Sequence, residues 1–336
     1  MWINDFLALY ANPLLAHADI AAAMSLKRAN LPRSLYRYRA FDEKGYALKT
    51  LSEDSVWLTQ PDQYNDPYDS CLTVPYQSFF AASLRASSSP TLRALGFKSL
   101  DPQIQSCDSS RCIVSPDSPI SQVDDEADSE FLDRYREILP GLFDDLSKKF
   151  LTPVIDSFLQ EQRKKLLICC FSQTNESILM WSHYADNHRG FCVAYDLFAL
   201  DEDDPRQRML FPVIYSDQMF DISRFILERI AGKSTSPFHA VLAAIHKSKA
   251  WEYEQEWRLL LPAIPDMPRN YPMPTAKAVY LGARITDENR QRLEQIADAR
   301  GIPVIPLRLA SGEFRLVSET TTHPNERSLS ASRNSS

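Results

Sequence analysis

The segment CCFSQTNESILMWSHYADNHRGFCVAYD, residues 169–196, carries the strongest information about the fold. It continues an apolar run that starts at 166, and the stretch 166–172 has the length and composition of a short buried strand. Residues 177–185 have the length and apolar spacing of a helix, and a second apolar run begins at Gly190. The segment therefore predicts a strand, a helix and another strand in close succession.

Further elements are predicted on both sides of this segment. Upstream, SLYRYRAF (34–41) and SVWLTQP (55–61) alternate like strands and are separated by turn residues. Downstream, 211–216 and 253–262 are predicted strands, and 276–317 fits strand, helix, strand, strand, with the helix ended by Gly301. Helices and strands alternate irregularly and without repeats, which predicts the α+β class.

The chain divides into three parts by composition. Residues 1–30 are apolar and alanine-rich, and they predict an N-terminal helical segment. Residues 31–318 are predicted to form a single α+β domain. It carries an insertion at 76–165, expected to be mobile where it is polar and helical near its end. Residues 319–336 have the composition of a disordered tail.

Composition excludes several function classes. With 8 glycines, and with neither a Rossmann nor a P-loop motif, phosphate binding by a glycine-rich loop is not expected. The net charge of −7 argues against broad adhesion to nucleic acid or to anionic membranes. No apolar run is long enough for a membrane span, the first residues lack a basic region, and the 6 cysteines form no C-x-x-C pair. These features predict a cytoplasmic protein that does not engage a membrane.

The predicted strand at 253–262 carries paired carboxylates. Alternation places Glu254, Glu256 and Arg258 on one face. Tyr253, Trp257 and Leu259 would then point into a core. Two carboxylates on one face repel each other unless a cation or a substrate hydroxyl lies between them. They can belong to a solvent-facing strand paired with neighbouring lysines and arginines, or to a binding site.

The predicted strand at 34–41 carries two arginines. Leu35, Arg37 and Arg39 share one face, opposite Tyr36 and Tyr38. Arginines in a strand are often surface residues whose stems cover apolar neighbours. Alternatively, their planar donors suit the phosphate or ribose oxygens of a ligand.

Three further groups of residues have both a structural and a functional interpretation. Trp181 and Tyr184 can share a helix face, as core residues or as a stacking platform. His183 and His188 with the adjacent cysteines give only weak metal-ligand spacing, so no metal is expected. Asn65 and Asp66 in NDPYD predict a turn, and they could also contact a ligand.

Taken in order, LYRYR, VWLTQPDQYNDPYDS, the 169–196 segment and YEQEWRL resemble the bacterial family called domain of unknown function 2971. This resemblance spans about residues 33–310 outside the insertion. The order of elements also resembles the ADP-ribosyltransferase fold. That resemblance implies two small, mostly antiparallel sheets forming a cleft, with peripheral helices and a helical insertion. Proteins of this superfamily bind NAD there without a glycine-rich loop.

The second resemblance implies roles for individual residues. Arg37 or Arg39 would hold the cofactor, Ser172 or Tyr184 would occupy the middle position, and Glu256 would stabilise an oxocarbenium-like ribose. Glu254 would orient or deprotonate the acceptor. The other candidates around the cofactor are Trp181, Asn65, Asp66 and His183.

The implied function is an NAD-consuming enzyme, either a mono-ADP-ribosyltransferase or an NAD glycohydrolase, with NAD as its substrate. By analogy it would act as a toxin or phage-defence effector. Its acceptor would be a protein side chain or a nucleic-acid base, and a neutralising or activating protein would be a natural partner. The alternative is a non-catalytic sensor or partner-binding module that uses the same cleft.

Overall fold

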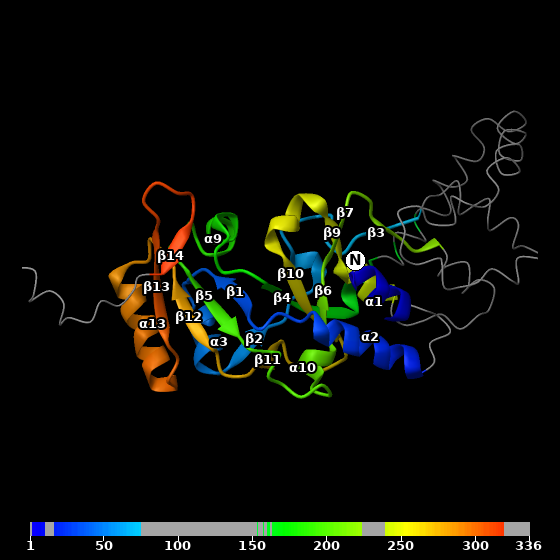
Figure 1. Cartoon of the computed structure of the whole chain (residues 1–336), viewed down its shortest axis with the longest axis horizontal. Coiled ribbons are helices and arrows are strands. Elements are labelled where there is room, and N and C mark those ends of the chain that lie inside the picture. Colours follow the sequence, from blue (N-terminus) through cyan, green and yellow to red (C-terminus); the bar gives the residue numbers. More distant parts are fainter. Residues whose placement is uncertain are drawn as a thin grey trace, which may run out of the picture.

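The computed structural model describes residues 2–10, 17–74, 163–223 and 239–318, with isolated helical positions between 153 and 161 (Figure 1). Almost all of the predicted insertion at 76–165, and the predicted tail at 319–336, lie outside these residues.

One large sheet organises the described part of the chain. Its strand order is β14 (Leu316–Ser318), β13 (Val304–Leu309), β12 (Ala278–Leu281), β5 (Phe191–Tyr195), β1 (Leu35–Arg39), β4 (Leu166–Ser172), β10 (Glu256–Pro262) and β6 (Leu210–Pro212). Neighbours are antiparallel except β12 and β13, which run parallel. The segment 169–196 therefore supplies most of β4 and all of α9 (Ile178–Tyr184) and β5, as its pattern predicts.

The sheet is narrowest between β1 and β4. These strands pair only through Tyr36 and Ser172, whereas β1 pairs with β5 along its whole length. The sheet therefore consists of a five-stranded and a three-stranded half with a short join. The sequence instead predicted two separate small sheets enclosing a cleft, and that cleft is not confirmed.

Three short two-stranded ribbons accompany the large sheet. They are β2 (Ser55–Trp57) with β11 (Asn270–Pro272), β3 (Leu72–Thr73) with β8 (Phe220–Asp221), and β7 (Ile214–Ser216) with β9 (His246–Ser248). The first ribbon is antiparallel and the other two are parallel. The α+β class with mostly antiparallel pairing is confirmed.

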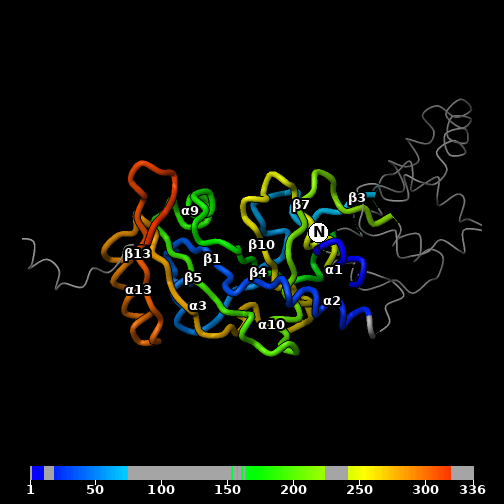
Figure 2. The backbone as a smooth tube through the Cα atoms, in the orientation of Figure 1, coloured from blue at the N-terminus to red at the C-terminus, as the bar shows by residue number. Residues whose placement is uncertain are grey.

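The helices surround the sheet at its edges and faces (Figure 2). In the described part of the chain they are α1 (Trp2–Tyr10), α2 (His17–Ala29), α3 (Tyr46–Ser52), α9, α10 (Pro205–Arg208), α12 (His239–Ile245) and α13 (Asp287–Arg300), with 3-10 turns η1 (Pro61–Gln63) and η5 (Lys249–Glu254). Gly301, at φ 64°, ends α13 as the sequence predicted, and the structure adds that Thr286 caps its start. Within the described ranges, no helix has the length and apolarity needed to cross a membrane.

The two faces of the sheet bury different clusters. One face packs Phe171, Val193 and Trp257 against residues of α3 and α13. On the other face, Ile168 and Leu260 of the three-stranded half pack against α1 and α12. Over the five-stranded half, the same face carries Tyr38 and Cys192 packed against Trp181 of α9.

The strand predicted at 253–262 begins later than expected. β10 starts at Glu256, and Glu254 ends the 3-10 turn η5. Gln255 has a left-handed backbone with φ 45°, which breaks the alternation between the two glutamates. Tyr253 consequently packs at the edge of the α9 cluster, on the other side from Trp257 and Leu259.

Lys27 of α2 is a buried cation that lacks a carboxylate partner among the described residues. Its side chain is 3% exposed, and its ammonium donates to the carbonyls of Gln207 and Arg208, each at 2.8 Å. It also lies 5.0 Å from the centre of the Phe211 ring. Burial, followed by repulsion from Arg208, lowers the pKa of Lys27 from 10.5 to about 7.

This lysine should make stability depend on pH in the mildly alkaline range. Between pH 7 and 10.5 the unfolded chain binds the Lys27 proton more tightly than the folded protein, so stability rises with pH. The contribution is at most about 1.4 kcal/mol per pH unit. The free energy of unfolding, measured with urea at several pH values from 7 to 9, should rise less steeply with pH for Lys27→Met than for wild type. The Lys49→Met variant, which changes an exposed lysine, should keep the pH dependence of the wild type. Equal pH dependence in all three proteins would show that Lys27 is not its source.

Candidate active site

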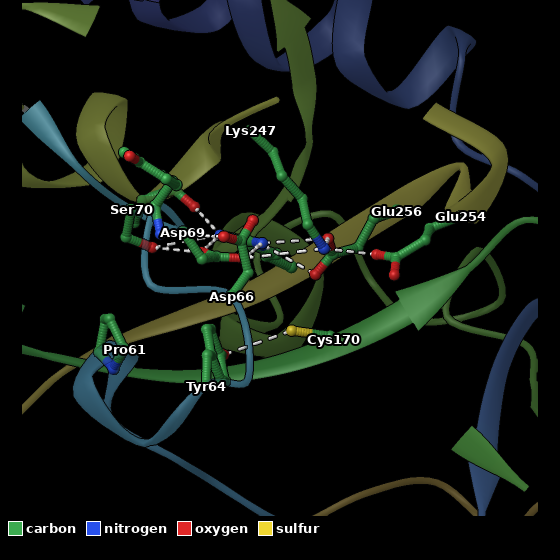
Figure 3. A network of polar contacts seen from close by, with 12 residues as sticks. Pro61, Tyr64, Asp66, Asp69, Ser70, Cys170, Lys247, Glu254 and Glu256 are labelled. Atoms are coloured by element: carbon green, nitrogen blue, oxygen red, sulfur yellow. Dashed lines mark hydrogen bonds and ion pairs between the residues drawn. The ribbon is translucent and has the colours of Figure 1, made fainter. Parts of the chain in front are cut away.

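A buried charge network lies beneath the three-stranded half of the sheet (Figure 3). It consists of Asp69, Lys247, Glu254, Glu256 and Arg258, and each side chain is less than one tenth exposed. These residues come from the turn before β3, from β9, from the end of η5 and from β10. Three carboxylates thus meet two cations in a space closed to solvent.

Arg258 holds two of the carboxylates together. Its Nε donates to Glu256 Oε1 at 2.8 Å, while Nη1 and Nη2 donate to the two oxygens of Asp69 at 2.8 and 2.6 Å. Nη1 also donates to the Ala244 carbonyl at the end of α12. Such bidentate contacts with a carboxylate are among the stronger hydrogen bonds in proteins. Arg258 therefore connects the turn before β3, α12 and β10.

Lys247 joins the third carboxylate to the other two. Its Nζ donates to Glu254 Oε2 and, at 3.0 Å, to Glu256 Oε2. The closest oxygen of Asp69 lies 3.7 Å away. The ammonium thus lies between the two glutamates and relieves their repulsion. It is the kind of cation that two neighbouring carboxylates were expected to need.

The two glutamates differ in acidity. Burial pushes the pKa of Glu256 upward, but the charges of Arg258 and Lys247 outweigh burial and hold it at about 2. Burial raises the pKa of Glu254 above its ordinary value, and the attraction of Lys247 offsets this only in part. Neighbouring carboxylates with oppositely shifted pKa values are typical of acid–base sites, although structural ion pairs produce similar shifts.

Glu254 is linked toward the surface through Tyr184. The Tyr184 hydroxyl donates to Glu254 Oε1 at 2.7 Å, and the tyrosine itself is half-buried at the end of α9. Around it lie His183, Trp251 and Tyr253, and His183 Nδ1 is 3.1 Å from the Tyr253 hydroxyl. Tyr184 and these three side chains are exposed or partly exposed, and the four are called the aromatic group below.

The remaining candidates occupy varied positions. Ser172 is buried and donates to the Glu254 carbonyl at 2.6 Å, which ties η5 to β4. Asp66 Oδ1 accepts from the Tyr68 amide, as the turn interpretation predicted, whereas its buried Oδ2 has no partner among the described residues. Asn65 is exposed, and Trp181 is fully buried with its indole donating to the Asn175 carbonyl.

Arg37 and Arg39 are not brought to this network. Tyr36, Ser172 and Glu256 lie opposite one another across β1, β4 and β10, so they share one sheet face. Arg37 and Arg39 alternate with Tyr36 and project from the other face. The cofactor contacts expected of them beside Glu256 are therefore not assembled in this structure.

Two members of the network were missed in the sequence. Asp69 belongs to the NDPYD turn, where turn chemistry accounts for the acidic residues without a distant partner. Lys247 has no distinguishing spacing in HKSKAW. In the described part of the chain, no three histidine, cysteine or acidic side chains are arranged to hold a metal ion.

Comparison with known families adds one finding. Residues 180–259 match a family described as protein of unknown function (DUF2971). The DUF2971 match covers less than a quarter of the chain, but it contains Tyr184, Lys247 and all of the network from β9 to β10. Asp69 and both arginines of β1 lie outside it. No significant match was found among curated proteins or among solved structures.

Proposed function

We propose that the protein consumes NAD by cleaving the bond between nicotinamide and ribose, with Glu254 and Tyr184 at the reacting centre. One observation carries the proposal. Glu254 and Glu256 share Lys247 but have oppositely shifted pKa values, and the more basic Glu254 is hydrogen-bonded to a half-buried tyrosine.

The chemistry suits a carboxylate at this position. Loss of nicotinamide leaves positive charge on the ribose, as in glycoside hydrolysis. A carboxylate near a ribose hydroxyl stabilises that charge more than it stabilises neutral ribose, which lowers the barrier. Because its pKa is raised, Glu254 is also the better base of the two for deprotonating an acceptor or water.

Glu256 receives a different role here from the one that the resemblance implied. Both of its oxygens accept hydrogen bonds from the buried cations Arg258 and Lys247, whereas one oxygen of the equally buried Glu254 accepts from the hydroxyl of the half-buried Tyr184. Glu256 acts as a positioning residue that keeps Lys247 beside Glu254. The aromatic group provides ring faces for a nicotinamide or adenine base. Asp66 Oδ2 is a buried acceptor that a ribose hydroxyl would satisfy.

The reaction is a transfer of ADP-ribose or a hydrolysis. In a transferase the acceptor is a protein side chain or a nucleic-acid base, and in a glycohydrolase it is water. A toxin or phage-defence role fits either activity, and such an enzyme would have a neutralising or activating partner protein. NAD is the substrate, and the proposal requires no metal.

A non-catalytic binding module is the second candidate function. The observation that favours it is that both oxygens of Glu256 accept hydrogen bonds from Arg258 and Lys247. A carboxylate bonded in this way can have a purely structural role. In that case the aromatic group, which includes Tyr184, would form a recognition surface for a partner or small molecule, and the buried network would only support it.

Nicotinamide release from NAD by the purified protein tests the proposal. Glu254→Gln should reduce the rate by about a hundredfold or more, since it removes the charge and the base. Tyr184→Phe removes one hydroxyl and leaves every ion pair in place, and it should reduce the rate by about tenfold. Tyr46→Phe is the matched control because Tyr46 is 57% exposed on α3, and it should retain full activity.

Thermal unfolding of each variant separates loss of activity from loss of fold. Absence of release by the wild type at millimolar NAD, with cell lysate supplied as a source of acceptors and partners, would overturn the proposal. A thermal shift with NAD but no release would support the binding module instead.

A further inference from the structure

Two arginines on β1 lie side by side, and within the described residues neither has a carboxylate at ion-pair distance. Arg37 and Arg39 project from the same face of the strand, opposite Val193 and Phe191 of β5. Among the residues that the structure describes, neither arginine forms an ion pair with a carboxylate. Arg258, on the other face of the sheet, instead binds two carboxylates.

Within the described residues, Arg37 contacts neutral acceptors. Its Nη1 approaches Cys169 Sγ and lies 3.4 Å from the Cys170 carbonyl, and its Nη2 lies 3.4 Å from the Trp57 carbonyl. The two carbonyl contacts are long for hydrogen bonds of a charged donor. Burial raises the pKa of the Cys169 thiol, so this sulfur does not supply a negative charge at neutral pH.

Arg39 is less satisfied still. Its Nε is buried and has no hydrogen-bond partner within the described residues. The nearby Asp42 carboxylate attracts Arg39 less strongly than Arg37 repels it, and Asp42 forms its hydrogen bonds with the amides of Tyr46 at 2.9 Å and Ala47 at 2.7 Å at the start of α3. Burial, and then repulsion from Arg37, lowers the pKa of Arg39 to about 10. A buried donor without a partner and two adjacent positive charges both lower the stability of the folded protein.

We propose that Arg37 and Arg39 together bind the phosphoryl group of a small ligand, either inorganic phosphate or a phosphate monoester. A phosphate dianion neutralises two guanidinium groups and accepts from both planar sets of donors, which a single carboxylate does less well. α3 and α13 cover most of this face, but both arginines are partly exposed and the neighbouring Trp57 is 50% exposed, so a solute can reach the arginines beside Trp57. The site lies on the opposite sheet face from Glu256 and is independent of the proposed NAD reaction.

Thermal unfolding and calorimetric titration at constant ionic strength test this site. The probes are inorganic phosphate and ribose 5-phosphate, with sodium chloride as the ionic-strength control. The wild type should be stabilised by millimolar phosphate but not by matched chloride. Arg39→Gln should weaken phosphate binding by about tenfold or more, and Arg39→Lys should weaken it too, because lysine keeps the charge but lacks Nε and the planar donors. Arg290→Gln, which removes an exposed arginine of α13, should bind as wild type does.

A second comparison distinguishes a binding role from a structural one. In phosphate-free buffer Arg39→Gln should unfold at the same temperature as wild type or higher. The substitution breaks no hydrogen bond or ion pair among the described residues, and the repulsion by Arg37 that it removes outweighs the attraction by Asp42. A clear drop in melting temperature there would assign Arg39 a structural role and overturn the proposal. So would an equal phosphate response in wild type, Arg39→Gln and Arg290→Gln, or no response in any of them. Preference for ribose 5-phosphate over inorganic phosphate would identify a monoester as the ligand.

Discussion

Replacing Arg258 with leucine is expected to lower the free energy of unfolding by about 3–5 kcal/mol. The side chain is fully buried and donates to both Glu256 and Asp69. Its removal leaves the three carboxylates of the network in a closed space with only Lys247 as a cation. The expected loss reflects these stranded charges more than the intrinsic strength of the ion pairs, since burying the whole set also costs desolvation.

Urea unfolding at pH 7 measures this effect, and Arg290→Leu is the matched control. Arg290 pairs with Glu294 on the surface of α13, so its removal should cost at most about 1 kcal/mol. If stranded charge is the cause, adding Asp69→Asn to Arg258→Leu should recover part of the loss, as a positive coupling in a double-mutant cycle. A loss below that of the surface control would show that the network contributes little to folding.

Arg258 should also affect how the free energy of unfolding changes in acid, through its effect on the pKa of Glu256. The pKa of Glu256 is about 2 in the folded protein, below its ordinary 4.5. Its stabilising contribution is therefore complete above pH 4.5 and is lost as the pH falls toward 2. Without Arg258 the pKa of Glu256 should rise, so the variant should lose less stability than wild type over that interval.

Local patterns were sufficient to predict most individual elements. The apolar run at 166–172 predicted β4, the alternation of LYRYR predicted β1, and Gly301 predicted the end of α13. These signals depend on a few consecutive residues, because strand alternation and helix capping are local properties. The grouping of Glu256 and Arg258 on one face was also predictable for this reason.

The candidate site depended on information that no single segment contains. Alternation shows which residues share a face within one strand, but only the pairing of Tyr36 with Ser172, and of Ser172 with Glu256, decides which faces coincide. A shift of one residue would have placed Arg37 with the glutamates. Asp69 and Lys247 enter the network only through tertiary packing, from segments whose local sequence has ordinary turn or surface composition.

The left-handed Gln255 was equally unpredictable, because glutamine has little preference for that conformation. It occurs where the Ser172 hydroxyl holds the Glu254 carbonyl and the 3-10 turn meets β10. This turn, rather than strand alternation, brings the Glu254 carboxylate to Lys247.

Gly190→Ala is expected to destabilise the fold by about 3 kcal/mol or more, at or above the upper end of ordinary overpacking effects. A methyl group at Gly190 would lie 2.1 Å from the Arg39 carbonyl oxygen and 3.0 Å from the backbone of Ala185. These are backbone atoms of β1 and of the end of α9, and they cannot rotate away as a flexible side chain can. The Gly190 amide also donates to the Ala185 carbonyl at 2.8 Å, so the loop cannot withdraw without losing that bond.

Gly312→Ala is the matched control because its φ is 84° and nothing lies within 4 Å of the added methyl. It should cost only the backbone strain of about 1–2 kcal/mol. The clash at Gly190 should also displace α9, which ends at Tyr184 just before this loop. A Gly190→Ala protein that still folds should therefore lose nicotinamide release along with stability, whereas Gly312→Ala should keep it. If Gly190→Ala unfolds no more easily than Gly312→Ala, the close approach of β1 to the loop after α9 does not hold Tyr184 in place.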